Sequence, residues 1–185
     1  MTVQEKLLTA EDLAAMPDDG KRHELVKGRL VEMSPPKLQH GILQTLVARF
    51  ISAYADEHKL GLTFTEVGCI LSRNPDNVRA PDVAFLAEGR LKSVDFGAYL
   101  PIAPDLVVEI VSPGDAASEI IDKINEYFEE GTRLMWLFYP QRRQVYVYKS
   151  PEDIQVVNID GILDGGDVLP GFKLPLRDVF QGLGE

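Results

Sequence analysis

The fold of this chain is decided by two stretches, residues 104–111 with the sequence PDLVVEIV and residues 81–86 with the sequence PDVAFL. Each is a run of apolar, largely β-branched side chains, which predicts a buried strand. Each also carries a carboxylate, Asp82 in one and Glu109 in the other. A carboxylate is rarely buried unless it is paired or holds a metal. Together with Lys123, these acids suggest a magnesium site for phosphate-ester chemistry.

Apolar residues outside these stretches recur with spacings that predict the other elements. A long helix is expected over residues 38–58, ended by Gly61, and a second over residues 116–130, capped by Asp115. The run at residues 134–139 is apolar on both faces, which is typical of a central strand. Further strands are expected as a hairpin at 23–33, at 62–71, 78–86, 106–111 and 144–148, and in the tail.

This order of elements predicts an α/β (α+β) fold, in which a twisted mixed sheet is flanked by helices and followed by extra C-terminal strands. A chain of 185 residues is expected to form a single domain over residues 1–185. The sequence has no bilayer-length apolar stretch and no signal-peptide pattern. The lone Cys69 is expected to be a buried small hydrophobe. These features predict a cytoplasmic protein with no membrane association.

The formal net charge of −10 argues against non-specific coating of nucleic acid, which needs a basic surface. A local basic patch could still contact phosphates, and Arg29, Lys37, Arg73 and Arg79 are its candidates. The sequence lacks the phosphate loop GxxxxGK[ST], the dinucleotide motif GxGxxG, a Cys/His cluster and the nucleophile elbow GxSxG. Nucleotide-driven chemistry and a structural zinc are therefore not expected.

Phosphodiester hydrolysis requires charge stabilisation at the attacking water and at the leaving oxygen, which a divalent cation supplies. Asp82 and Glu109 have the type and number of ligands that Mg²⁺ takes from proteins, and Lys123 could orient or deprotonate the water. Each residue also has a structural alternative. Asp82 could cap a turn or pair with Arg79, Glu109 could have a buried cation partner, and Lys123 could be a surface lysine on its helix.

The chain resembles the PD-(D/E)XK nucleases, and in wider pattern the Uma family of restriction-endonuclease-like proteins. The signature lysine expected two residues after Glu109 is replaced by Val111, and Lys123 fits a variant in which that lysine has moved to the following helix. The matching pieces run in order along nearly the whole chain: residues 24–35 (ELVKGRLVEMSP), His40, residues 81–85 (PDVAF), residues 108–113 (VEIVSP), Lys123, Tyr127, residues 136–137 (WL) and residues 169–172 (LPGF).

The resemblance implies a restriction-endonuclease-like core and a Mg²⁺-dependent endodeoxyribonuclease, with Mn²⁺ as a substitute and products bearing a 5′-phosphate. It implies that Asp82 and Glu109 hold the metal and that Lys123 positions the water. It adds Glu24 as a third acid near the metal and His40 as a catalytic candidate. Without the resemblance, Glu24 would be a solvated strand residue and His40 would make a local hydrogen bond at a helix start.

Two other functions remain open on the sequence. The acidic composition and the missing Glu-x-Lys lysine favour a catalytically silent protein of the nuclease fold that acts as a binding or regulatory module. The tail at residues 145–180 carries apolar and aromatic residues that could form the interface of a homodimer. Two-fold symmetry would suit the cutting of both strands of a duplex.

Overall fold

The computed structural model describes residues 6–181 and 183, and its larger sheet is mixed, as predicted. The strand order is β10-β9-β8-β7-β6-β3, and β8 lies between β7 and β9 inside the sheet. The β7–β8 pair is parallel and the other pairs are antiparallel. The strands are β3 (Gly61–Phe64), β6 (Val83–Ala87), β7 (Leu106–Ile110), β8 (Leu134–Tyr139), β9 (Gln144–Tyr148) and β10 (Ile154–Val157).

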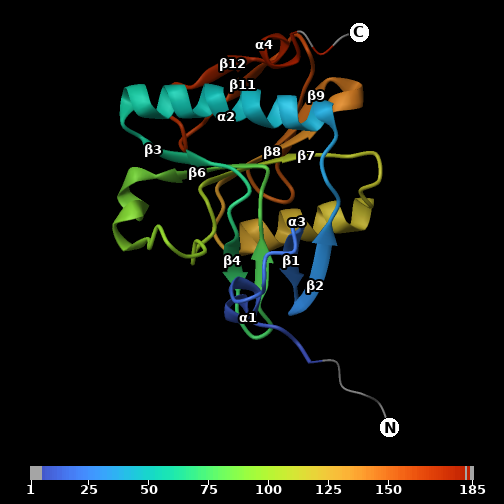
Figure 1. Cartoon of the computed structure of the whole chain (residues 1–185). Helices are drawn as coiled ribbons and strands as arrows, with labels where there is room; N and C mark the ends of the chain where they lie inside the picture. Colours follow the sequence, from blue (N-terminus) through green and yellow to red (C-terminus); the bar gives the residue numbers. More distant parts are fainter. Residues whose placement is uncertain (1–5, 182, 184–185) are drawn as a thin grey trace.

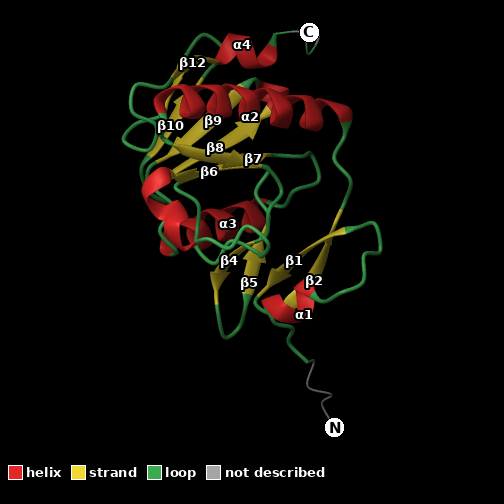
Figure 2. Cartoon of the chain, turned by 60° about the vertical axis from the view of Figure 1, so that its left-hand side comes forward, coloured by secondary structure: helices red, strands yellow, loops and turns green. Residues whose placement is uncertain are grey.

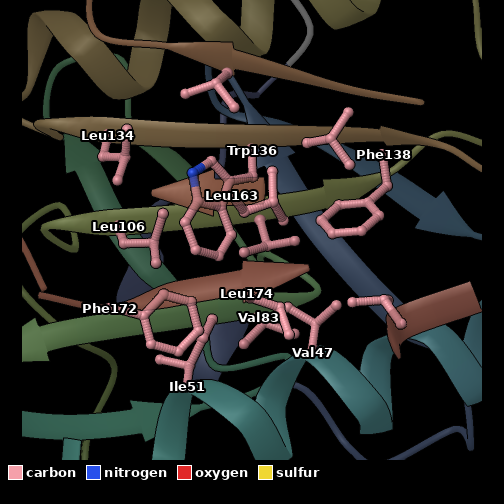
Figure 3. Close-up of a cluster of buried hydrophobic side chains, with 14 of the residues drawn as sticks. Val47, Ile51, Val83, Leu106, Leu134, Trp136, Phe138, Leu163, Phe172 and Leu174 are labelled. Atoms are coloured by element: carbon pink, nitrogen blue, oxygen red, sulfur yellow. The ribbon is translucent and has the colours of Figure 1, made fainter. Parts of the chain in front are cut away.

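Two long helices cover opposite faces of this sheet, with α2 (Leu38–His58) on one side and α3 (Ala117–Glu129) on the other (Figure 1). Under α2, the buried core brings Val47 and Ile51 against Trp136 of β8 (Figure 3). The C-terminal elements and the loops between them complete that core through Leu163, Phe172 and other apolar residues. These elements are β11 (Ile162–Asp164), β12 (Lys173–Pro175) and α4 (Leu176–Phe180), so extra C-terminal strands are present, and much of the tail's apolar surface is buried within the chain itself.

A smaller sheet of order β2-β1-β5-β4 stands beside the larger one (Figure 2). It contains the predicted hairpin and two further strands, and a short helix packs against it through Leu13 and Leu25. The elements are α1 (Ala10–Ala14), β1 (Arg22–Val26), β2 (Arg29–Met33), β4 (Cys69–Ser72) and β5 (Asn77–Arg79). The short helices η1 (Glu88–Ser93) and η2 (Pro140–Arg142) follow later in the chain.

Two predicted strands are each divided between the sheets, which corrects the sequence prediction. The run at 62–71 becomes β3 and β4, and the run at 78–86 becomes β5 and β6. Pro81 interrupts the second run because it has no N–H to donate to a ladder. Both breaks fall where the chain passes from one sheet to the other, so Asp82 lies at a junction rather than inside a continuous strand.

The predicted helix ends also need correction. Lys59, not Gly61, takes the left-handed conformation that ends α2, with φ 54°. Asp115 does not cap α3, because Ala116 occupies that position and the Asp115 carboxylate accepts a hydrogen bond of 2.8 Å from the Ser112 N–H. Cys69 is fully buried, as expected. Over residues 6–181 and 183, no helix has the length and apolarity needed to cross a bilayer.

Replacing Lys59 with glycine is expected to stabilise the protein by about 1 kcal/mol, because a side chain is unfavourable in the left-handed conformation that glycine adopts freely. The melting temperature should rise by about 2–4 °C, measured by circular dichroism. Glu57→Gly is the matched control, since glycine inside the exposed part of the same helix should cost about 1 kcal/mol. A lower melting temperature for both variants would contradict this prediction.

Candidate active site at the junction of the sheets

Asp82 and Glu109 are brought together by the pairing of β6 with β7. Val83 lies opposite Val108 in this antiparallel pair, so the next position outward places Asp82 beside Glu109. One carboxylate oxygen of Asp82, Oδ2, accepts a hydrogen bond of 2.7 Å from the backbone N–H of Ile110. The two acids that lie apart in the sequence therefore converge at one end of adjacent strands.

Helix α3 supplies the positively charged side chain of the site, Lys123. The Nζ atom of Lys123 donates to Glu109 Oε2 at 3.2 Å and lies 3.8 Å from Glu24 Oε1. One turn further along the helix, the Tyr127 hydroxyl donates to Glu109 Oε1 at 3.4 Å. Lys123 therefore reaches the strand acids from the helix that follows them, as the resemblance implied, and the lysine is not a solvated surface residue.

Glu24 enters the site from β1 and is almost completely buried. Its Oε2 atom accepts a hydrogen bond of 2.9 Å from Arg79, and its Oε1 atom accepts one of 3.0 Å from the Ala80 N–H. Arg79 also donates from Nε to Glu126 Oε2 of α3 at 2.8 Å. This buried Glu24–Arg79–Glu126 triad connects the smaller sheet to α3, and it excludes the sequence alternative that Arg79 pairs with Asp82.

Helix α2 contributes the remaining side chains. His40 lies on its first turn, and its Nε2 atom is 2.9 Å from Asp82 Oδ1. The other ring nitrogen, Nδ1, is buried and has no hydrogen-bond partner within the described part of the chain. Gln44, one turn later, donates hydrogen bonds of 3.0 Å each to the Asp82 carbonyl and to Glu66 Oε1. The position of Asp82 is therefore fixed from both α2 and β7.

The pKa values of the site residues are shifted because several carboxylates lie close together and are buried. Burial raises the pKa of Glu109 to about 7, the Lys123 ammonium opposes that rise, and the charges of Asp82 and Glu24 add to it. Burial by itself would lower the pKa of Lys123, but Glu109 and Glu24 outweigh it, so the pKa of Lys123 is raised and the group stays an ammonium. The hydrogen bond to Asp82 raises the pKa of His40.

All five residues singled out in the sequence, Asp82, Glu109, Lys123, Glu24 and His40, thus meet at one junction. Sequence reasoning missed Glu126 and Gln44, and it put Arg79 in the wrong role. Of the four candidates for a basic patch, Arg79 is buried between two glutamates and Arg73 is paired with Glu11 and Asp76, so these two do not form one. The spacing of Gln44 four residues after His40, on the same helix face, was the available signal for Gln44.

Across residues 6–181 and 183, no group of three or more His, Cys, Asp or Glu side chains is arranged to hold a metal ion. The site instead offers Asp82 and Glu109, with Glu24 turned toward Arg79 and Lys123. Two carboxylates satisfy the needs of Mg²⁺, which is held by one or two protein carboxylates while waters and phosphate complete its shell.

Comparison with known proteins shows the family and the fold of the chain. A family model described as "Uma2: Putative restriction endonuclease" matches residues 10–177. Among solved structures, the chain is similar to a putative nuclease belonging to DUF820 from Anabaena variabilis, with a TM-score of 0.81 and 21% sequence identity over 94% of this chain and 97% of that one. At that identity, the likeness supports the fold. No curated protein matches the sequence.

Proposed function

The chain belongs to the Uma2 family of putative restriction endonucleases, and from this premise we propose that it is a Mg²⁺-dependent nuclease that hydrolyses phosphodiester bonds of DNA. The observation that carries the proposal is the convergence of Asp82, Glu109 and Lys123 from two strands and a helix. In this assignment Asp82 and Glu109 hold Mg²⁺, with Mn²⁺ as a substitute. The metal would supply Lewis-acid stabilisation of the charge that develops on phosphate oxygens.

The residues fit a divalent cation on electrostatic grounds. Burial raises the pKa of Glu109, and the charges of Asp82 and Glu24 add to that rise. The ammonium of Lys123 compensates only part of it. A group of acids that resists full ionisation is the donor set that a bound cation would stabilise.

Each protein group then has a defined task. Glu109 and Glu24 raise the pKa of Lys123, and in this assignment its ammonium is a hydrogen-bond donor that orients the attacking water and a phosphate oxygen. Tyr127 and the backbone of Ile110 fix the two acids, and His40 holds the second oxygen of Asp82. Glu24 keeps Lys123 close to Glu109. The products would carry a 5′-phosphate.

The direct test is to incubate the purified protein with supercoiled plasmid, short duplexes and single strands, with Mg²⁺, Mn²⁺ or EDTA. Metal-dependent cleavage with 5′-phosphate ends supports the proposal. Absence of any Mg²⁺ or Mn²⁺ binding that depends on Asp82 and Glu109 would favour the alternative function, a catalytically silent binding or regulatory module. That alternative rests on the net charge of −10 and on Val111 at the usual position of the lysine. Metal binding without cleavage of these polymers would instead point to a more specific substrate.

A homodimer and a cytoplasmic location complete the proposal. Paired sites related by two-fold symmetry would cut both strands of a duplex. The apolar side chains of the tail that stay exposed for such an interface are Ile154 and Val156 on β10 and Ile162 on β11. Sedimentation velocity measures the oligomeric state directly, and a monomer at all concentrations would remove the homodimer from the proposal.

The affinity for Mn²⁺ is expected to rise with pH and to level off above about 7. Glu109 must lose its proton to bind a metal, and its pKa of about 7 means that the proton competes with the metal at lower pH. Below that value, affinity should fall by up to about tenfold for each pH unit. Isothermal titration calorimetry measures this affinity, and Glu129→Gln, at an exposed acid on the helix that carries Lys123, is the control. An affinity that is constant between about pH 5 and 8 would contradict the prediction.

A further inference from the structure

A partly exposed ion pair lies beside the candidate site. Arg22, the first residue of β1, pairs through Nη1 with Glu66 Oε1, and Glu66 lies in the loop that joins β3 to β4. Their side chains are 36% and 33% exposed, in contrast to the 7% of Arg79. Ion pairs that are this accessible contribute little to stability. A competing anion could therefore displace the Glu66 carboxylate.

Glu66 is fixed in place relative to Asp82. Its φ of 56° is in the left-handed region, which is uncommon for a glutamate. Its N–H donates to the Pro81 carbonyl at 3.0 Å, and Gln44 bridges Glu66 Oε1 and the Asp82 carbonyl with two hydrogen bonds of 3.0 Å. The carboxylate that faces Arg22 is therefore held by Gln44 of α2 and by the segment that carries Asp82.

Arg22 is the more accessible cation beside the site. The two cations deeper in the site, Lys123 and Arg79, are largely buried and paired with Glu109, Glu24 and Glu126. In a chain with a net charge of −10, a polyanion approaching this place needs a more accessible cation.

We propose that Arg22 is a binding residue for the phosphate backbone of the nucleic-acid substrate and that Glu66 occupies its guanidinium in the free protein. When a polymer binds, a phosphate oxygen replaces the Glu66 carboxylate on Arg22. The inference rests on the proposed function, because it takes the substrate to be a phosphodiester polymer. The exchange breaks one ion pair and forms another, so no covalent step is involved.

The test measures equilibrium binding in a cleavage-silent background, Glu109→Gln. Fluorescence anisotropy with a labelled short duplex and a labelled single strand, over a range of salt concentrations, gives the affinity and its salt dependence. Arg22→Gln should weaken binding about fivefold and reduce the slope of log Kd against log salt by about 0.9 for the duplex. Glu66→Gln should tighten binding by a similar factor, because Arg22 is then available without displacement.

The double variant separates this exchange from simple charge repulsion. If Glu66 acts by occupying Arg22, the gain from Glu66→Gln should disappear when Arg22→Gln is also present. If Glu66 only repels phosphates, the gain should be the same in both backgrounds, which would overturn the inference. The exposed pair Lys21–Glu32 is the matched control. Lys21→Gln and Glu32→Gln make the same changes of charge as Arg22→Gln and Glu66→Gln, at positions on or next to the hairpin that carries Arg22.

The outcomes distinguish this inference from the proposed function. Cleavage by the parent protein with binding that is indifferent to Arg22 overturns the inference alone. Binding that depends on Arg22, without cleavage by the parent, overturns hydrolysis alone. If the protein binds neither the duplex nor the single strand, the inference is overturned. If Glu109→Gln does not fold, as judged by circular dichroism, the parent protein in EDTA provides the silent background.

Discussion

Replacing Asp82 with asparagine is expected to reduce the rate of Mg²⁺-dependent DNA cleavage by about a thousandfold or more. Metal ions contribute several kcal/mol of transition-state charge stabilisation, and about 1.4 kcal/mol corresponds to a factor of ten in rate. The amide of the variant would keep an oxygen for the Ile110 N–H but would lose the charge that a cation requires. Single-turnover cleavage of a labelled duplex measures the rate, and calorimetry with Mn²⁺ measures the loss of metal binding.

The chain contains a close control for this substitution. Asp105 also follows a proline at the start of a buried strand, and it is at least as deeply buried as Asp82, but its carboxylate is paired with Arg90 and bonded to the Ala87 N–H. Asp105→Asn should lower the melting temperature and leave the cleavage rate of the folded protein unchanged. If Asp82→Asn cuts as fast as the parent, the metal-ligand assignment is wrong.

Replacing Arg79 with methionine is expected to destabilise the protein by about 3–5 kcal/mol, the usual consequence of removing one partner from a buried ion pair. Two carboxylates with side-chain exposures of only 2% and 13%, Glu24 and Glu126, would lose their common cation. For a chain of this size the melting temperature should fall by about 10 °C. Urea denaturation followed by tryptophan fluorescence is a suitable measurement because Trp136 is fully buried.

Neutralising the two acids distinguishes lost charge compensation from lost packing. In the triple variant with Glu24→Gln and Glu126→Gln, more than half of the stability should return, since the uncompensated charges are gone. Arg177→Met is the control, because Arg177 and its partner Asp160 are both largely exposed and such pairs contribute little. A fall in melting temperature of equal size in the control and in Arg79→Met would contradict this interpretation.

Part of the site could be predicted from the sequence because the residue types and their spacing within a short segment indicate which side chains are buried. A carboxylate in an apolar run, as with Glu109 in residues 104–111, signals a buried acid wherever the strand packs. The spacing of apolar residues likewise predicted the helix α3, which carries Lys123. The hydrogen bond from Lys123 to Glu109 is visible only in the structure. The central position of β8 followed from a run with no polar face.

Other features depend on pairing between distant segments, which periodicity does not encode. The runs at 62–71 and 78–86 each look like one strand, since apolar side chains continue through them, and only the packing of two sheets decides where each run changes partner. The triad joins Glu24 near the start of the chain to Arg79 in its middle and to Glu126 well beyond. Such contacts join segments that are far apart in the chain, so the local pattern of residues does not predict them.

The sequence by itself therefore predicted the mixed sheet between helices, its central strand, and Asp82, Glu109 and Lys123 as candidate site residues, whereas Glu24 and His40 were added by the family resemblance. The tertiary structure decided which carboxylate faces which cation: Lys123 to Glu109, Arg79 to Glu24 and Glu126, and Arg22 to Glu66. The physical reason is that burial and hydrophobic period are properties of a short segment, whereas the strength of an ionic interaction depends on the separation and shielding of two groups, which exist only after the sheets have packed.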